Sequence, residues 1–194
     1  MDDAPPSPSV PAASTFGAVA IALHWLIALL IVVAFLVGLS MVDLPFSPRR
    51  FRFFNWHKWL GIAALFLSAA RLLWRAAGHP PPPAPVGMAA WQRSASRAAH
   101  ALFYVLFFLV PLLGWAYTSA VGVPVVFLGV LPLPDFVPRD KALGDVMKGL
   151  HELASWLLAA LVVLHVAAAL KHHYLERDGL LVRMWPWWPS GRRV

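Results

Sequence analysis

The sequence predicts an all-α integral membrane protein with the fold of a four-helix bundle. The chain has 194 residues, of which 60% are hydrophobic and only 13% are charged. A soluble domain contains about 25% charged residues, so this chain has too few of them to cover a surface in water. Four apolar segments approach the roughly 20 residues that an α-helix needs to cross a bilayer. We therefore expect four membrane-spanning helices.

The first two predicted spans cover about residues 16–42 and 53–75. No charged residue occurs in the first span, which is too long for a cleavable signal peptide and lacks the basic flank of one. The second span contains Lys58 and Arg71. Each lies close enough to an end of the helix for its side chain to reach the polar interface, so both are compatible with a spanning helix.

The other two predicted spans cover about residues 98–119 and 150–174. Pro111 lies inside the third span and predicts a kink there. Between these spans, residues 121–134 are apolar but interrupted by glycines and prolines. We expect this stretch to be a loop or a short helix that lies on the membrane surface.

Residues 16–184 are therefore predicted to form one transmembrane domain between a proline-rich tail (1–15) and a tryptophan-rich interfacial tail (185–194). The side of the membrane that holds both tails has nine Lys and Arg residues, and the other side has seven. This difference favours a cytoplasmic location for both termini. The net charge of +7 is interpreted as attraction of the loops to anionic lipid, not to nucleic acid.

The chain contains no cysteine. This excludes iron–sulfur clusters, thiolate-ligated or covalently attached haem, zinc ribbons and disulfides. Any metal or redox chemistry must therefore use histidine, methionine or carboxylate side chains.

Five histidines lie within the predicted spans: His24, His57, His100, His151 and His165. Ionisable residues inside a membrane are costly and usually functional. A single histidine is more often hydrogen-bonded to a neighbouring helix or placed at the interface, and we interpret His100 in that way. The other four lie at matched depths, which a purely structural role does not explain.

His151 and His165 are fourteen residues apart on one predicted helix, so they lie about 21 Å apart along it and differ by only about 40° in direction. Alternating helix directions then place His57 near His151 at the outer surface and His24 near His165 at the cytoplasmic surface. Two facing imidazoles at each of two depths are what bis-histidine ligation of two haems requires. A zinc or proton site would need carboxylates or clustered histidines within a turn or two of these four, and the only carboxylate in the spans is Glu152, near a helix end.

Four segments resemble the prokaryotic b561-type di-haem cytochromes, and the resemblance covers about residues 16–186. The fourth segment is the most specific, because its His165 is followed after six residues by a His-His-Tyr sequence. The segments are ALHWL (22–26), WHKWLG (56–61), KGLHE (148–152) and LHVAAALKHHY (164–174).

The resemblance implies a multi-pass protein of the bacterial inner membrane whose four helices hold two b haems. His24, His57, His151 and His165 fall on the ligand positions, in agreement with the pairing from depth. It also implies electron transfer to the quinone pool, in its most concrete form the oxidation of superoxide to dioxygen with ubiquinone as the electron acceptor. The alternative is a membrane anchor and electron conduit for a separate dehydrogenase or reductase subunit, with no substrate of its own.

Basic residues near the outer histidine pair are candidates for steering superoxide, because a cationic rim raises the on-rate of an anion. These candidates are Arg49, Arg50 and Lys148, which could equally contact lipid headgroups or haem propionates.

Two further pairs of residues lie towards the cytoplasmic side. Arg71 and Arg75 are a turn apart and suit haem propionates or lipid phosphates. His172 and His173 are candidates for hydrogen bonding to a quinone carbonyl, although they could instead cap the fourth helix, where positive charge complements the helix dipole.

Overall fold

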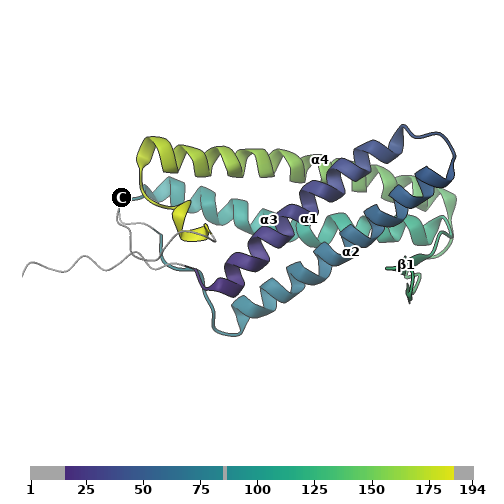
Figure 1. The fold of residues 1–194 in the computed structure, drawn as a ribbon, viewed down its shortest axis with the longest axis horizontal. Helices are drawn as coiled ribbons and strands as arrows, with labels where there is room; N and C mark the ends of the chain where they lie inside the picture. Colours follow the sequence, from purple (N-terminus) through teal and green to yellow (C-terminus); the bar gives the residue numbers. More distant parts are fainter. Residues whose placement is uncertain (1–15, 85–86, 186–194) are drawn as a thin grey trace, which may run out of the picture.

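The structure is a computed structural model that describes residues 16–84 and 87–185. The predicted tail 1–15 lies outside these residues, as does the tail 185–194 apart from Trp185. Four long helices form a bundle (Figure 1) and each is long and apolar enough to cross a membrane, which confirms the predicted all-α membrane fold. They are α1 (Ala18–Val42), α2 (Pro48–Ala76), α3 (Ala90–Ala120) and α4 (Lys141–Lys171).

Three of the helices begin earlier than the apolar runs indicate, because their first turns are polar. α2 begins after Ser47, whose hydroxyl accepts the N–H of Arg50 at 3.3 Å. α4 begins after Asp140, whose carboxylate accepts the N–H of Leu143 at 2.9 Å. Such caps satisfy backbone donors that the helix itself leaves unpaired. α3 begins at Ala90 rather than near residue 98, so the helices extend beyond the part that the bilayer requires.

The helices pack as two antiparallel pairs. α1 lies along α2, and α3 lies along α4, while α2 also contacts α3 (Figure 1). Phe35 of α1 meets Trp156 of α4 edge to face at 5.2 Å between ring centroids, which brings the first and last helices together. The most buried cluster lies between α3 and α4 and consists of Phe103, Leu106, Ala154 and Leu158.

The two ends of the bundle differ. At what we call the terminal end, α1 and α3 begin and α2 and α4 finish, and the N–H of Phe16 donates to the carbonyl of Arg183 at 3.5 Å. Trp25 Nε1 donates to the carbonyl of Met184 at 2.7 Å, which holds the C-terminal segment against α1. The opposite end, the hairpin end, holds a small sheet beside α2 (Figure 1).

That sheet corrects the expectation of a loop or short helix over residues 121–134. β1 (Val125–Phe127) pairs antiparallel with β2 (Leu131–Leu133). Three residues, 128–130, connect the strands, and Leu128 and Gly129 have positive φ of 52° and 76°, as is common in tight hairpin turns. The strands have only three residues each, too few to produce an alternating pattern in the sequence.

Side chains of α2 attach this hairpin to the bundle. Lys58 Nζ donates to the carbonyl of Pro124 at 3.0 Å, and Trp59 Nε1 donates to the carbonyl of Val126 at 2.7 Å. Both donors directly follow His57 in the sequence. The hairpin is therefore fixed beside the part of α2 that contains this histidine.

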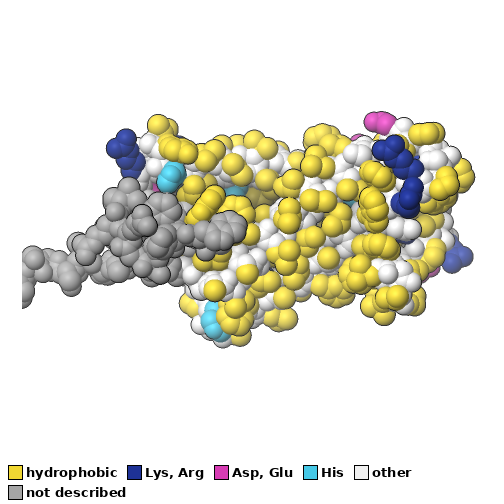
Figure 2. Space-filling view, viewed as in Figure 1, with side chains coloured by type: hydrophobic (Ala, Val, Ile, Leu, Met, Phe, Trp, Pro, Cys, Tyr) yellow, Lys and Arg dark blue, Asp and Glu magenta, His cyan; other side chains and the backbone are white. Residues whose placement is uncertain are grey.

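The surface is that of a protein embedded in lipid. Figure 2 shows hydrophobic side chains over the middle of the visible face and Lys or Arg side chains at its two ends. Exposed apolar area on this scale is not found on soluble monomers, so lipid must cover it. Large exposed apolar residues include Leu29, Leu36, Phe66, Leu73, Val105 and Val163.

At Gly144, α4 packs tightly against the end of α3. A Cβ at Gly144 would lie 2.8 Å from Val121 Cγ1, whereas a Cβ at Gly149 of the same helix would meet nothing within 4 Å. We expect Gly144→Ala to lower the free energy of unfolding in detergent by about 1–3 kcal/mol through overpacking. Gly149→Ala is the matched control and should leave it unchanged or raise it by up to about 1 kcal/mol. Equal unfolding midpoints, measured by circular dichroism, would contradict this packing.

Candidate functional site

Two pairs of histidines face each other in the bundle, one pair near each end. His57 of α2 and His151 of α4 form the hairpin-end pair, with ring centroids 5.9 Å apart. His24 of α1 and His165 of α4 form the terminal-end pair, with ring centroids 6.3 Å apart. The structure thus brings together the four histidines in the two pairs that helix depth predicted.

The separation within each pair fits one metal ion between two imidazoles. An imidazole nitrogen lies about 2 Å from a metal that it ligates and about 1 Å from its own ring centre, so two opposed ligands have centroids about 6 Å apart. Both observed values, 5.9 and 6.3 Å, match this spacing. Two axial histidines on one iron is the ligation of an electron-transfer haem.

Backbone carbonyls orient both rings of the hairpin-end pair. His57 Nδ1 lies 2.9 Å from the carbonyl oxygen of Ala34, and His151 Nδ1 lies 2.9 Å from that of Val110. A carbonyl only accepts, so each Nδ1 must hold the hydrogen, and each Nε2 keeps a lone pair for a metal. This arrangement is typical of metal-ligating histidines.

Glycines make these two contacts possible. A Cβ at Gly38 would lie 3.1 Å from Cε1 of His57, and a Cβ at Gly114 would lie 3.0 Å from Cε1 of His151. Each glycine stands four residues after the carbonyl that the histidine contacts, so it lies one turn above that carbonyl on the same face. In both the α1–α2 pair and the α3–α4 pair, a backbone carbonyl faces the histidine and a glycine one turn later leaves space for the ring. This arrangement was not predicted from the sequence. A glycine within an apolar helix was the available signal.

The terminal-end pair has different neighbours. Arg71 Nη1 lies 3.3 Å from Nδ1 of His24, and a guanidinium offers donors only. The ring of His100 lies edge-on to that of His165 at 5.7 Å. Its Nδ1 is 2.7 Å from the carbonyl of Ser96 one turn earlier. His100 was expected to have a structural role at the interface, and the structure places it beside this pair.

Arg75, predicted with Arg71 to meet propionates, has another environment. Its Nη1 donates to the hydroxyl of Tyr104 at 3.1 Å, and its guanidinium lies 5.3 Å from the centre of that ring. Arg71 is half-buried and points to the terminal-end pair, whereas Arg75 is exposed. The hydrogen bonds of the two arginines therefore go to different side chains.

A buried hydroxyl between the two pairs supports the presence of a polar ligand in the bundle. Ser68 of α2 is only 1% exposed, and its Oγ has no hydrogen-bond partner among the residues that the structure describes. Buried polar atoms are almost always hydrogen-bonded. Ser68 is eleven residues after His57, which is close to three whole turns, so it shares that face of α2.

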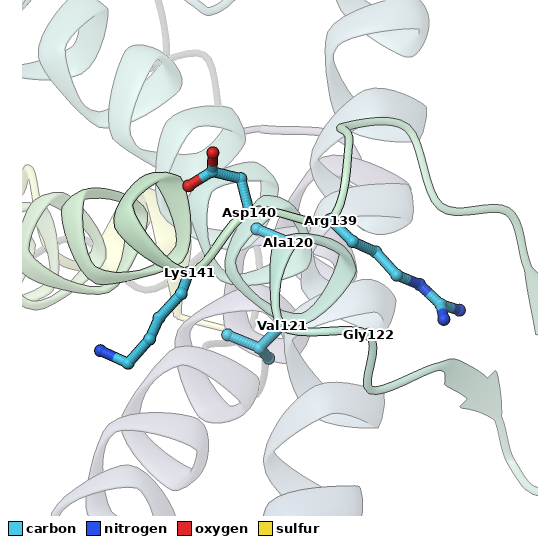
Figure 3. A pocket seen from close by; sticks show the side chains of 6 residues that line it. All are labelled: Ala120, Val121, Gly122, Arg139, Asp140 and Lys141. Atoms are coloured by element: carbon cyan, nitrogen blue, oxygen red, sulfur yellow. The ribbon is translucent and has the colours of Figure 1, made fainter.

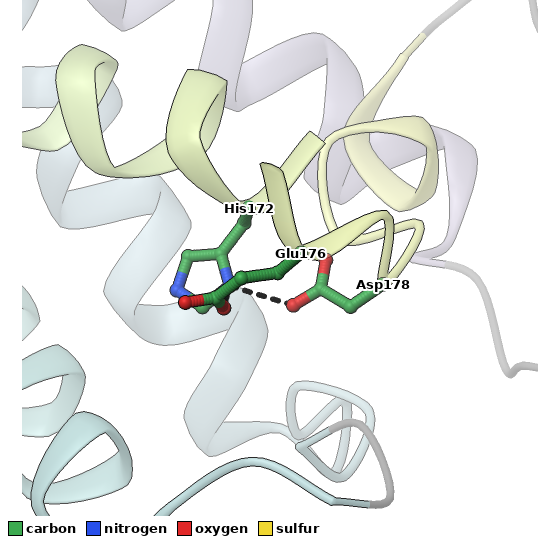
Figure 4. Close-up of side chains that lie close together, drawn as sticks. All are labelled: His172, Glu176 and Asp178. Carbon is green, nitrogen blue, oxygen red and sulfur yellow. Dashed lines mark hydrogen bonds and ion pairs between the residues drawn. The ribbon is translucent and has the colours of Figure 1, made fainter. Parts of the chain in front are cut away.

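His172 is held by two carboxylates where α4 passes into a π-helix (His172–Glu176) (Figure 4). Its Nδ1 lies 2.6 Å from Glu176 Oε2 and 2.6 Å from Asp178 Oδ2. Figure 4 shows the ring of His172 beside the carboxylates of Glu176 and Asp178. Lys171 and Gln92 both donate to the other oxygen of Glu176, at 2.6 and 3.0 Å.

This cluster fixes the C-terminal segment to the bundle. Asp178 also accepts the N–H of Leu180 at 3.0 Å, and Arg183 Nη2 donates to the carbonyl of Pro83 at 2.9 Å. Burial lowers the pKa of Arg183, and nearby Asp178 opposes that shift. The ring of His173 lies outside this cluster and packs against Tyr174, with 4.8 Å between the ring centroids. The two adjacent histidines therefore have separate surroundings.

The predicted steering residues all lie at the hairpin end. Arg49 and Arg50 lie over the rings of Phe53 and Phe54, each at 5.6 Å. Lys148 is exposed on α4, one turn before the histidine of the hairpin-end pair. Within residues 16–84 and 87–185, no carboxylate lies at ion-pair distance from these three cations. Their positive charge is therefore not neutralised there.

A separate open pocket at this end has a volume of about 410 Å³. Figure 3 shows that Arg139 and Lys141 extend in different directions around it. Lys141 bonds to Asp145 at 2.9 Å, so its charge is neutralised. The lining residue Lys141 is ten residues before His151 on α4, which is about 15 Å along the helix. The pocket is therefore distinct from the histidine pair.

Comparisons with known proteins agree with this geometry. Residues 15–187 match the family model described as prokaryotic cytochrome b561. The chain is 32% identical over 170 residues to "Cytochrome b561 homolog 2" of Escherichia coli (strain K12), which covers 87% of this chain and 90% of that protein. It is 32% identical over 177 residues to "Probable superoxide oxidase CybB" of Yersinia pestis, which covers 86% and 93%.

A third relative, "Cytochrome b561 homolog 1" of Escherichia coli (strain K12), is 36% identical over 107 residues, 55% of this chain and 57% of that protein. The family match spans the whole described bundle and so includes both histidine pairs. The resemblance seen in the sequence is confirmed. The chain belongs to the prokaryotic cytochrome b561 family of electron-transferring membrane proteins, a membership that implies haem b as its cofactor.

Proposed function

We propose that this chain is a di-haem cytochrome that transfers electrons through the membrane from the hairpin end to the terminal end. The spacing of the two histidine pairs supports this proposal above all, because each fits one bis-histidine iron. His57 and His151 are the ligands at the hairpin end, and His24 and His165 are those at the terminal end. When bound, haem supplies one-electron transfer without an open coordination position for dioxygen.

We propose superoxide as the electron donor. The similarity to a protein named as a probable superoxide oxidase supports this substrate, as do the unneutralised charges of Arg49, Arg50 and Lys148, which would attract a small anion. Two superoxide anions would each lose one electron to become dioxygen. One quinone would gain the two electrons and take up two protons to become quinol, so the reaction is balanced.

We propose ubiquinone as the acceptor, bound at the terminal end. The carboxylates of Glu176 and Asp178 accept from Nδ1 of His172. Nε2 would therefore donate a hydrogen bond to a quinone carbonyl when the ring is the imidazolium cation, in which both nitrogens carry hydrogen. His173 is the second candidate for that contact. Arg75 is exposed at the same end and is a candidate to bind a haem propionate. Arg71, the other arginine singled out in the sequence, lies beside Nδ1 of His24 instead.

The distribution of Lys and Arg supports an orientation with both termini in the cytoplasm of a bacterium. The hairpin end would then face the periplasm, where superoxide would meet Lys148. The terminal end would face the cytoplasm, which would supply the protons that quinol formation requires. The bacterial inner membrane is the location that this orientation assumes.

The haem content of the purified protein tests the two-pair arrangement. We expect two b haems per chain by pyridine haemochrome assay, about one after His165→Ala, and two after His100→Ala. His100 is the informative control because its ring lies as near to His165 as does that of His24. Loss of a haem from His100→Ala, or one haem in the unaltered chain, would contradict the assigned ligands.

The glycines beside the hairpin-end histidines provide a second test. Gly38→Ala and Gly114→Ala should each reduce haem content from about two to about one per chain, because the added methyl group would displace the ring at 3.0–3.1 Å. Gly61→Ala is the control, since its Cβ would lie 4.0 Å from the nearest neighbouring atom. Equal haem content in all three variants would show that the histidines do not need this space.

Superoxide steering can be tested by rapid mixing. Lys148→Ala should slow haem reduction by superoxide several-fold, and added salt should slow the unaltered protein, since steering as a whole contributes roughly 10- to 1000-fold to on-rates. Lys141→Ala is the matched control, because Asp145 already neutralises that lysine. If superoxide reduces the haem slowly and salt does not change the rate, superoxide is not the substrate. A reductase or dehydrogenase subunit that copurifies with such a protein would support the electron-conduit alternative.

A further inference from the structure

The two histidine pairs differ in what faces the nitrogen that does not ligate. At the hairpin end, both Nδ1 atoms lie 2.9 Å from backbone carbonyl oxygens. At the terminal end, Nδ1 of His24 lies 3.3 Å from a guanidinium nitrogen of Arg71. One environment offers negative ends of dipoles, and the other offers a full positive charge.

These environments act on a bound iron in opposite directions. A carbonyl that accepts the ligand's N–H makes the imidazole a stronger electron donor, which favours the oxidised, more positive metal. A guanidinium cannot accept that hydrogen and stays protonated in proteins. The hydrogen bond from Arg71 to Nδ1 of His24 therefore belongs to the ring without metal. A neutral ring that ligates through Nε2 would carry its hydrogen on Nδ1 and would face the positive charge without that hydrogen bond. A nearby positive charge favours the reduced, less positive metal, and this effect is strong where the dielectric constant is low.

The charge of Arg71 is not compensated by protein groups. In the part of the chain that the structure describes, no carboxylate lies within ion-pair distance of it. The side chain is half-buried inside a predicted membrane span. Its guanidinium lies 3.3 Å from Nδ1 of His24. An intramembrane cation of this kind usually has a functional role.

We propose that Arg71 raises the reduction potential at the terminal-end pair above that at the hairpin-end pair, and so sets the direction of electron transfer. The proposal rests on the di-haem function proposed above. One electron would leave a ferrous iron at the hairpin end, which becomes ferric, and would convert a ferric iron at the terminal end to ferrous. No proton or further reactant is needed for this step.

The order of the potentials in the unaltered protein is the first test. Spectroelectrochemical titration should resolve two components, and single-haem variants would assign them. The haem that remains in His57→Ala should match the component of higher potential, and the haem that remains in His165→Ala should match the lower one. The reverse order would overturn the proposal, whatever the variants of Arg71 do.

Variants of Arg71 provide the second test. Arg71→Gln retains a hydrogen-bond donor but loses the charge, so the equilibrium constant for moving the electron to the terminal end should fall about tenfold, or about 59 mV for one electron. Arg71→Lys retains the charge and should preserve most of the difference. Only the component assigned to the terminal end should shift.

Arg97→Gln is the matched control. Arg97 lies on α3 at the same end, is exposed, and bonds to Ser94 at 3.4 Å rather than to a histidine. Its loss should leave both potentials unchanged. If haem propionates neutralise Arg71, Arg71→Gln will behave like this control. If Arg71 holds His24 as an imidazolate, Arg71→Gln will raise the potential. Either result would overturn the proposal.

These measurements are separate from the test of the proposed function. If the chain binds two haems with equal potentials, the di-haem assignment stands and only the proposed role of Arg71 is wrong. A chain that binds fewer than two haems would lose the assignment itself. Haem content measured on the same samples distinguishes the two outcomes.

Discussion

The contact between an imidazole and the backbone of a neighbouring helix determines how this bundle is built. At the hairpin end, the helix that faces each histidine must offer both an accepting carbonyl and, one turn later, a residue with no side chain. In lipid, a polar ring without such a partner would be costly. The close approach of α1 to α2 and of α3 to α4 meets this requirement, and the two rings that it positions have centroids 5.9 Å apart.

The same contact explains why the two halves of the bundle resemble each other while their ends do not. Gly38 with His57 and Gly114 with His151 are equivalent arrangements in successive helix pairs. The terminal end lacks this repetition, because His24 faces Arg71 and His165 faces His100. On the proposal above, a nearly symmetric scaffold in which only the terminal-end pair of the described residues faces a guanidinium would favour electron transfer in one direction.

Much of the fold could be predicted because lipid imposes simple rules. Apolar length predicted the four helices, and helix rise with alternating direction predicted which histidines pair. The rest depended on contacts that single residues make across the bundle. The β-hairpin at Val125–Leu133 is too short to show a period, and the partners of His172 lie on a π-helix and the loop after it. A glycine within an apolar helix indicates close packing, but the neighbour that Gly38 or Gly114 borders lies on another helix, so the local sequence does not identify it as a histidine.

α4 provides one histidine to each pair, α1 and α2 provide one each, and α3 provides none. α4 is also the last helix to be synthesised, since chains are made from the N-terminus. Neither pair can exist until this helix has been inserted beside the other three. On the proposed ligand assignment, haem loading would therefore require that α4 has been inserted, and a chain truncated before residue 151 would have no complete axial pair at either end.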